Sequence, residues 1–144
     1  MEKKLDLTSL LKAYNSYINA LEYVKMVESE DDSDNPFYTD EMVRAGLIQH
    51  FEYLYELSWI TMKKFIKIDE GREDSLTRKG FFRHAGERGL IDDYYKWMEF
   101  HNARNSTSHM YDEEIAEKVY ISAKEFDKYV KKFILVLEEK VKDL

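Results

Sequence analysis

The sequence predicts an all-α protein, folded as an antiparallel up-and-down helical bundle of about five helices. Five glycines and one proline make about 4% of the chain, whereas an ordinary protein carries roughly 12% of these two residues. So few turn residues cannot connect the many short strands of a sandwich or barrel. Apolar residues recur every three or four positions through most of the sequence, which is the spacing of helices that pack on a core. The length of 144 residues predicts a single domain, residues 1–144.

The first half of the chain predicts two long helices. Residues 5–27 place apolar side chains at steps of three and four, so we expect the first helix there. The acidic residues 28–35 offer no apolar side chain to bury and are predicted to form a solvated loop. Thr39 or Asp40 is predicted to cap a second helix, whose long apolar face covers residues 47–66.

The second half predicts three more helices. Ser75 is expected to cap a short third helix that ends at Gly89. A fourth helix is expected over about residues 91–105, with Asp93 in its first turn. It should end there because the following Asn-Ser-Thr-Ser run bonds to its own backbone instead of continuing a helix. Asp112 is expected to cap the last helix, which continues almost to the C-terminus.

Charge and composition exclude several classes of protein. The formal charge of −7 works against sequence-blind adhesion to DNA or to anionic membranes. The absence of cysteine excludes disulfides, thiolate metal sites and cysteine nucleophiles. No segment approaches the ~18 apolar residues of a membrane span, and the N-terminus lacks the apolar run of a signal peptide. We therefore expect a cytoplasmic protein that does not enter a membrane.

One segment, residues 101–114, is chemically distinctive. It reads His-Asn-Ala-Arg-Asn-Ser-Thr-Ser-His-Met-Tyr-Asp-Glu-Glu, so four short polar residues separate Arg104 from His109. A tight turn can bring both side chains to one side of a helix junction. Cleavage of RNA needs a base for the 2′-hydroxyl proton, and histidine with its pKa of ~6.5 suits that role. It also needs a fixed positive charge on the phosphorane oxygens, which a guanidinium supplies. Alternatively, Arg104 and His109 only stabilise the turn through backbone hydrogen bonds.

The reaction also needs a proton donor for the leaving group, and one histidine serves poorly as both base and acid. A two-fold homodimer would bring a second His109 to the same cleft. Eleven tyrosines provide aromatic surface for such an interface. DNA lacks the 2′-hydroxyl, so we expect it to be spared.

The same segment matches the motif of a known family. Arg104, His109 and Tyr111 form an Arg-x4-His-x-Tyr pattern. Residues 51–59, Phe-Glu-Tyr-Leu-Tyr-Glu-Leu-Ser-Trp, are similar to the family's Phe-Glu…Glu-Leu-x-Trp helix, and the likeness continues through residues 88–92, Arg-Gly-Leu-Ile-Asp. On these residues the chain resembles the HEPN toxins of HEPN/MNT toxin–antitoxin pairs, which in older naming are nucleotidyltransferase substrate-binding proteins.

This resemblance implies a HEPN-like four-helix core and a type VII-like toxin, a metal-independent endoribonuclease that works as a homodimer without a cofactor. It implies that Arg104 and His109 are the catalytic pair and that Asn105 supports them. It also implies an antitoxin partner, a minimal nucleotidyltransferase that transfers AMP from ATP to Tyr111. A bulky, anionic AMP group beside His109 would fill the cleft and repel the phosphates of RNA. Tyr111 could in addition pack as a hydrophobic staple on the last helix.

Two glutamates of the second helix are candidates to orient the arginine. Glu52 and Glu56 lie one turn apart, and like charges at that spacing cost ~0.2–0.5 kcal/mol in an isolated helix. If the second and fourth helices pack together, Arg104 would compensate these charges and be held in place. The chain departs from the family at Ile60, where lysine is common, and at His101, one turn before the arginine.

The same sequence also bears on other functions. No glutamate is followed by histidine three positions later, which argues against a di-metal site of the carboxylate type. Residues 75–88 carry four basic side chains and one acidic one, either to contact RNA phosphates or as a solvated face. The main alternative function is a non-catalytic subunit that presents a substrate to the partner nucleotidyltransferase, with Arg104 and Tyr111 as docking residues. The third possible function is that of a plain dimeric scaffold.

Overall fold

The computed structural model describes residues 5–30, 36–71 and 76–144, and of residues 36–40 it describes the backbone alone. This part of the chain is helical and contains no strand, so the predicted all-α fold is confirmed. The elements are α1 (Thr8–Glu30), α2 (Pro36–Glu70), α3 (Arg78–Glu87), α4 (Tyr94–Asn105), the 3-10 helix η1 (Ser106–His109) and α5 (Glu113–Val141).

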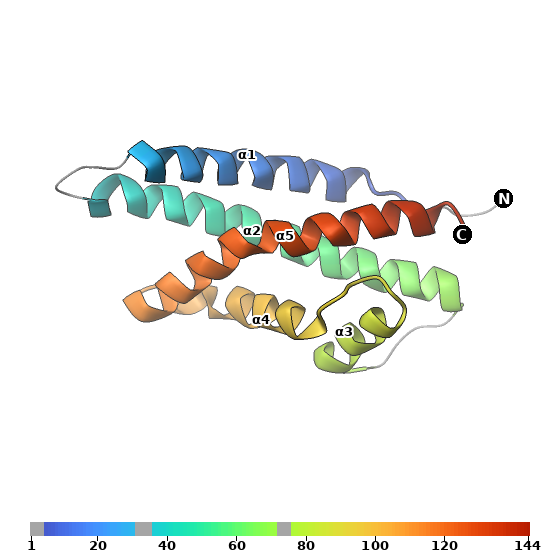
Figure 1. Ribbon diagram of the computed structural model, residues 1–144. Coiled ribbons are helices and arrows are strands. Elements are labelled where there is room, and N and C mark those ends of the chain that lie inside the picture. The colour runs from blue at the N-terminus through green and yellow to red at the C-terminus, as the bar shows by residue number, and fades with distance from the viewer. Residues whose placement is uncertain (1–4, 31–35, 72–75) are drawn as a thin grey trace.

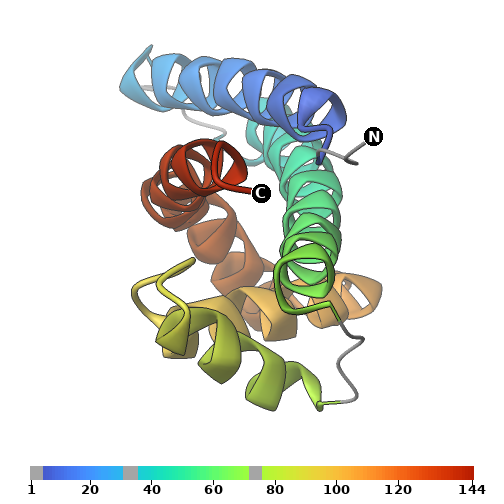
Figure 2. The same cartoon turned by 90° about the vertical axis from the view of Figure 1, so that its right-hand side faces the viewer.

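The long helices run alternately in opposite directions (Figure 1). α1 and α2 form an antiparallel hairpin, α4 returns along the bundle, and α5 runs back between the other helices. The short helix α3 lies in the connection from α2 to α4, near the end of the bundle where the C-terminus lies. The view along the bundle shows α1 on one side, α3 and α4 on the opposite side, and α2 and α5 between them (Figure 2).

Aromatic rings fill the centre of the bundle. Phe126 of α5 is fully buried, and rings from α1, α2 and α4 surround it at centroid distances of 4.9 to 6.4 Å. These rings belong to Tyr17, Phe51, Tyr55, Trp97 and Phe100. The hydroxyl of Tyr17 donates a hydrogen bond of 2.6 Å to the carbonyl of Ala123, so its polar end is satisfied inside the core. Part of the high aromatic content is therefore used in the core.

The connection between α1 and α2 differs from the prediction. α1 continues to Glu30, so Glu28 is helical instead of lying in a loop. Its carboxylate accepts hydrogen bonds from Tyr120 at 2.7 Å and Lys124 at 3.1 Å, two side chains of α5 that the local sequence does not reveal. α2 begins at Pro36, before the predicted caps, in keeping with the preference of proline for the first helical position. Most of the predicted loop, residues 31–35, lies outside the described residues.

α3 is bounded by a threonine cap and a glycine. The Thr77 hydroxyl accepts a 3.1 Å hydrogen bond from the Gly80 amide and caps the helix, whereas the predicted cap Ser75 lies outside the described residues. At the other end Gly89 adopts φ +76°, a left-handed conformation in which a side chain is strained. α3 itself ends at Glu87 with Arg88 as its C-cap, two residues before the glycine at which the prediction placed its end.

The ends of α4 and α5 nearest the distinctive segment agree with the prediction. α4 ends at Asn105, and Asp112 caps α5 through its side chain. The start of α4 is later than expected because Asp93 accepts a 3.2 Å hydrogen bond from the Lys96 amide. Asp93 is therefore the N-cap and not a first-turn residue, and the helix begins at Tyr94.

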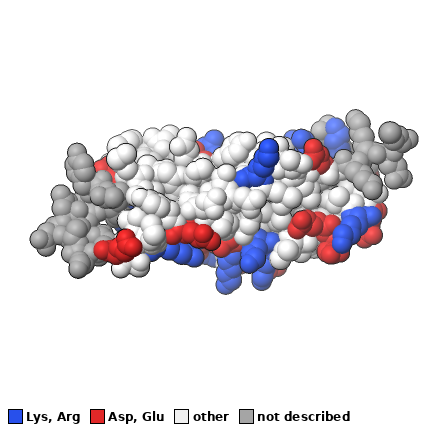
Figure 3. Space-filling model, turned by 90° about the horizontal axis from the view of Figure 1, so that it is seen from above, with Lys and Arg blue, Asp and Glu red and all other residues white. Residues whose placement is uncertain are grey.

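Much of the outer face of the α1–α2 hairpin is uncharged (Figure 3). Figure 3 views the molecule from the α1 side, where uncharged side chains cover much of the surface. Tyr23 of α1 and Met42 of α2 are exposed there and, together with Gly46, help to line a groove of about 470 Å³. Among the described helices, none combines the length and apolar character needed to cross a membrane.

Candidate active site

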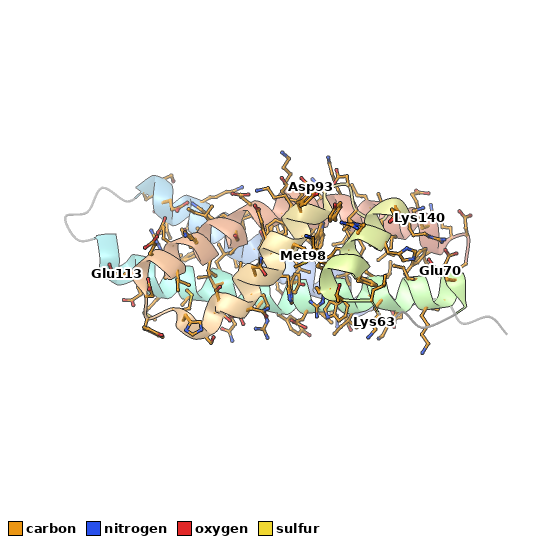
Figure 4. The ribbon with its side chains drawn as sticks, turned by 90° about the horizontal axis from the view of Figure 1, so that it is seen from below. Lys63, Glu70, Asp93, Met98, Glu113 and Lys140 are labelled. Atoms are coloured by element: carbon orange, nitrogen blue, oxygen red, sulfur yellow. The ribbon has the colours of Figure 1, made fainter. Side chains whose placement is uncertain are left out.

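The Arg-x4-His segment forms a compact corner where α4 passes through η1 into α5. Its short polar side chains bond back to the end of α4: Ser106 donates to the Asn102 carbonyl at 2.9 Å, and Thr107 donates to the Arg104 carbonyl at 2.8 Å. These bonds satisfy carbonyl groups that the helix end leaves open, so the chain can tighten and turn. In Figure 4, Glu113 at the start of α5 lies at the opposite end of the bundle from Glu70, the last residue of α2.

Arg104 lies between the two glutamates of α2. Its Nη1 is 3.8 Å from Glu52 Oε2 and its Nε is 3.3 Å from Glu56 Oε1. The Nε atom is buried and its contact with Glu56 lacks hydrogen-bond alignment, so the pair is ionic. The Arg104 side chain is 35% exposed, which leaves part of the guanidinium open to solvent. The predicted packing of the second and fourth helices, with Arg104 between these carboxylates, is confirmed.

His109 and Tyr111 lie together on the solvent side of the corner. His109 Nδ1 is 3.3 Å from the Tyr111 hydroxyl, and the two rings meet edge to face. Tyr111 is 83% exposed, so the hydrophobic staple is wrong for this residue. In the described part of the chain, no hydrogen bond or ion pair joins Arg104 directly to His109. His109 is exposed and its Nδ1 lies near the Tyr111 hydroxyl, while two carboxylates of α2 hold the guanidinium of Arg104.

Asn105 belongs to a hydrogen-bonded chain that sequence reasoning missed. Its Nδ2 lies 3.2 Å from His101 Nε2, and His101 Nδ1 lies 2.9 Å from both the Tyr55 hydroxyl and Arg78 Nη1. Arg78 also donates to the Tyr55 hydroxyl at 2.7 Å, and its guanidinium stacks 3.6 Å above the ring of Trp59. The only sequence signals were the unusual His101 and the basic character of residues 75–88.

Burial and neighbouring charges determine the protonation states of His101 and Tyr55 in this hydrogen-bonded chain. Partial burial is the largest cause of a lowered pKa of His101. The positive charges of Arg78 and Arg104 lower this pKa further, and the negative charge of Glu56 opposes them. Burial raises the pKa of Tyr55 well above its ordinary value. At neutral pH the imidazole is therefore uncharged and the phenol keeps its proton.

Basic residues of α3 and its C-cap, Arg88, contact α2. Arg78 covers Trp59, and Arg88 forms an ion pair with Asp69 at the end of α2. His84 Nε2 lies 2.6 Å from Glu70, so this part of α3 is not merely a solvated basic face. Within the described residues, no three His, Asp or Glu side chains gather where they could hold a metal ion.

The fold and the corner together define a class of protein. It is an antiparallel helical bundle that carries at one end an Arg-x4-His motif, followed two residues later by an exposed tyrosine. The family described as nucleotidyltransferase substrate binding protein like matches residues 5–139, and the chain belongs to this family. The family predicted from the sequence is thereby confirmed.

Individual relatives agree with this assignment. A Haemophilus influenzae protein named probable ribonuclease HepT is 39% identical over 94 residues, which cover 63% of this chain and 64% of that protein. The solved structure of HI0074 from Haemophilus influenzae is described as the fold of a substrate binding domain of a nucleotidyltransferase. It matches with a TM-score of 0.82 and 31% identity, over 92% of this chain and 99% of its own. A Thermus thermophilus protein of solved structure matches with a TM-score of 0.63 and 25% identity, over 84% and 98% of the two chains.

Proposed function

We propose that this protein is the toxin of a HEPN/MNT toxin–antitoxin pair, an endoribonuclease that acts in the cytoplasm as a homodimer without a metal. The observation that supports this most is the corner itself, which holds an exposed His109 beside Tyr111 and, five residues earlier in the sequence, an Arg104 held by two carboxylates. The name probable ribonuclease given to the Haemophilus relative supports the same class of reaction.

In the proposed reaction His109 accepts the proton of a 2′-hydroxyl, and the resulting oxygen attacks the adjacent phosphorus. The bond to the 5′-oxygen breaks, which leaves a 2′,3′-cyclic phosphate and a 5′-hydroxyl. The imidazolium form of the second subunit's His109 supplies the proton to the leaving oxygen. Arg104 stabilises the negative charge on the phosphorane, and Asn105 assists as a hydrogen-bond donor. If His109 Nδ1 donates to the Tyr111 hydroxyl, its Nε2 is the free base.

Regulation in this proposal acts through Tyr111. The partner nucleotidyltransferase transfers AMP from ATP to the phenol oxygen, and pyrophosphate leaves. The exposure of Tyr111 makes this oxygen accessible to a second protein. The added nucleotide takes the place beside His109 and brings a phosphate charge that repels RNA.

The first test incubates purified protein with total RNA in the presence of a chelator. We expect cleavage by the wild type and by His50→Ala, a control histidine on the exposed side of α2, and none by His109→Ala or Arg104→Ala. Persistent absence of cleavage, or equal cleavage by His109→Ala, contradicts the proposal.

The homodimer is tested by mixing subunits. The proposed reaction uses both copies of His109, so a mixed dimer of one wild-type and one His109→Ala subunit should be inactive. In co-refolded mixtures, activity should therefore fall more steeply than the fraction of wild-type protein. Light scattering should show a dimer. An active monomer would contradict the two-subunit cleft.

The alternative is a non-catalytic subunit that presents a substrate to the nucleotidyltransferase. The family description and the description of HI0074 favour it. Expression of this chain without its partner separates the two, since growth arrest that depends on His109 fits only the nuclease. In the alternative, Arg104→Ala and Tyr111→Phe should weaken partner binding, and the protein should leave RNA intact.

A further inference from the structure

We propose that His101 is a positioning residue: with its ring proton on Nε2, it turns the carboxamide of Asn105 so that the NH2 group faces the RNA. This inference rests on the proposed function, because it assigns Asn105 a phosphate-binding task in that cleft. The inference is drawn from the chain of hydrogen bonds that runs from Arg78 and Tyr55 through His101 to Asn105. This chain connects the corner to side chains of α3 and α2 that are distant in the sequence.

The donors around Nδ1 fix the position of the ring proton. A guanidinium can only donate, and Arg78 Nη1 lies 2.9 Å from His101 Nδ1. The Tyr55 hydroxyl lies at the same distance and already accepts a hydrogen bond from Arg78 at 2.7 Å, so its own proton also points to Nδ1. Nδ1 must therefore be the acceptor, and in a neutral imidazole the proton then lies on Nε2.

The proton on Nε2 determines how Asn105 is turned. Nε2 faces the carboxamide at 3.2 Å and, as a donor, needs an oxygen there. The oxygen and nitrogen of a carboxamide exchange places by a half-turn that leaves the shape of the side chain unchanged. Asn105 therefore accepts from Nε2 through Oδ1 and directs both of its N–H bonds away from His101. The alternative tautomer leaves two donors, Nδ1 and Arg78, pointing at each other.

The consequence is a second phosphate-binding group beside the arginine. Asn105 directly follows Arg104 and is exposed, so its N–H groups are available to a phosphate oxygen. The charged groups that face His101 are Arg78 from α3, Glu56 from α2 and Arg104 from α4. With two cations against one carboxylate, this environment favours an uncharged ring that can act through its tautomer.

The direct test reads the tautomer by NMR without any reaction. Long-range proton–nitrogen correlation spectra of 15N-labelled protein at pH 7 should show His101 as a neutral ring with the proton on Nε2, assigned by the loss of its signals in His101→Gln. Arg78→Met should mix the two tautomers, because one of the two donors to Nδ1 is gone. A ring with the proton on Nδ1, or a charged ring at pH 7, overturns the proposal.

Two matched variants connect the tautomer to RNA cleavage. In His101→Gln the amide replaces Nε2 and can still donate to Asn105, whereas in His101→Asn it replaces Nδ1 and leaves Asn105 without its partner. We expect kcat to fall by about 5- to 10-fold in His101→Asn, the loss of about one hydrogen bond, and by less than about 2-fold in His101→Gln. In an Asn105→Ala background the two variants should become equal.

The outcomes separate this inference from the proposed function. If the wild type does not cleave RNA but the Nε2–H tautomer is found, the nuclease fails while the assignment of the ring proton stands. If RNA is cleaved and the two His101 variants lose activity equally in the presence of Asn105, the residue only supports the fold and the positioning role is wrong.

Discussion

The ion pairs of Arg104 predict an unusual effect of Glu56→Gln on RNA cleavage. The substitution removes the carboxylate that lies 3.3 Å from Arg104 Nε and keeps the size of the side chain. Both partners are more than a third exposed, at 35% for Arg104 and 39% for Glu56, so water screens the pair and it contributes on the order of 1 kcal/mol. Loss of that orientation should reduce kcat by about 5-fold. The same substitution removes a negative charge near an anionic substrate, so KM should stay constant or fall.

The matched control for this prediction is Glu113→Gln. Glu113 lies in the exposed first turn of α5 near the same corner, and removing its charge leaves the contacts of Arg104 intact. Steady-state kinetics on a short RNA should show lower kcat for Glu56→Gln only. Equal kcat in both variants, or a rise in KM for Glu56→Gln, would refute the idea that the carboxylate orients the guanidinium.

Three further predictions concern stability and are measured by urea unfolding. Gly89→Ala should cost roughly 1–2 kcal/mol because φ is +76°, whereas Gly46→Ala, with open space at its Cβ, should gain about 0.5–1 kcal/mol. Phe126→Ala should cost about 3–5 kcal/mol, since the ring lies at the centre of the aromatic core. Burial and Arg78 hold the pKa of His101 below its usual 6.5, so the unfolded chain binds this proton more readily. Its contribution to stability is therefore complete above that pH and is lost as the pH falls below it, and His101→Gln should flatten this slope between pH 7 and pH 5.

The sequence predicted the elements whose signals are local. The three- and four-residue spacing of apolar side chains identified the packed faces of α1, α2 and α5, whereas α3 and α4 were predicted mainly from the residues at their ends. The cap at Asp112 and the helix end at Asn105 followed from the preferences of individual side chains for helix ends. The ion pair of Arg104 with the α2 glutamates was predicted only as a condition, because it required knowing that α2 and α4 pack together.

The remaining features depend on contacts between distant segments. Glu28 continues α1 because Tyr120 and Lys124 of α5 meet its carboxylate, and nothing near Glu28 in the sequence indicates this. In the same way, Arg78 and His101 are separated by 23 positions and meet only because α3 folds back on α2 and α4. A basic residue that looks solvated in the sequence therefore becomes part of the structure that supports the corner.

The most direct test of the account is the chemistry of the cut ends. A short RNA that the protein cleaves is compared with the same RNA carrying one 2′-deoxy sugar at the cleaved position, both with chelator present. The account predicts 2′,3′-cyclic phosphate and 5′-hydroxyl ends from the first RNA and no cut at that position in the second. A cut beside the 2′-deoxy sugar, or 5′-phosphate ends, would contradict a mechanism in which His109 activates the neighbouring 2′-hydroxyl.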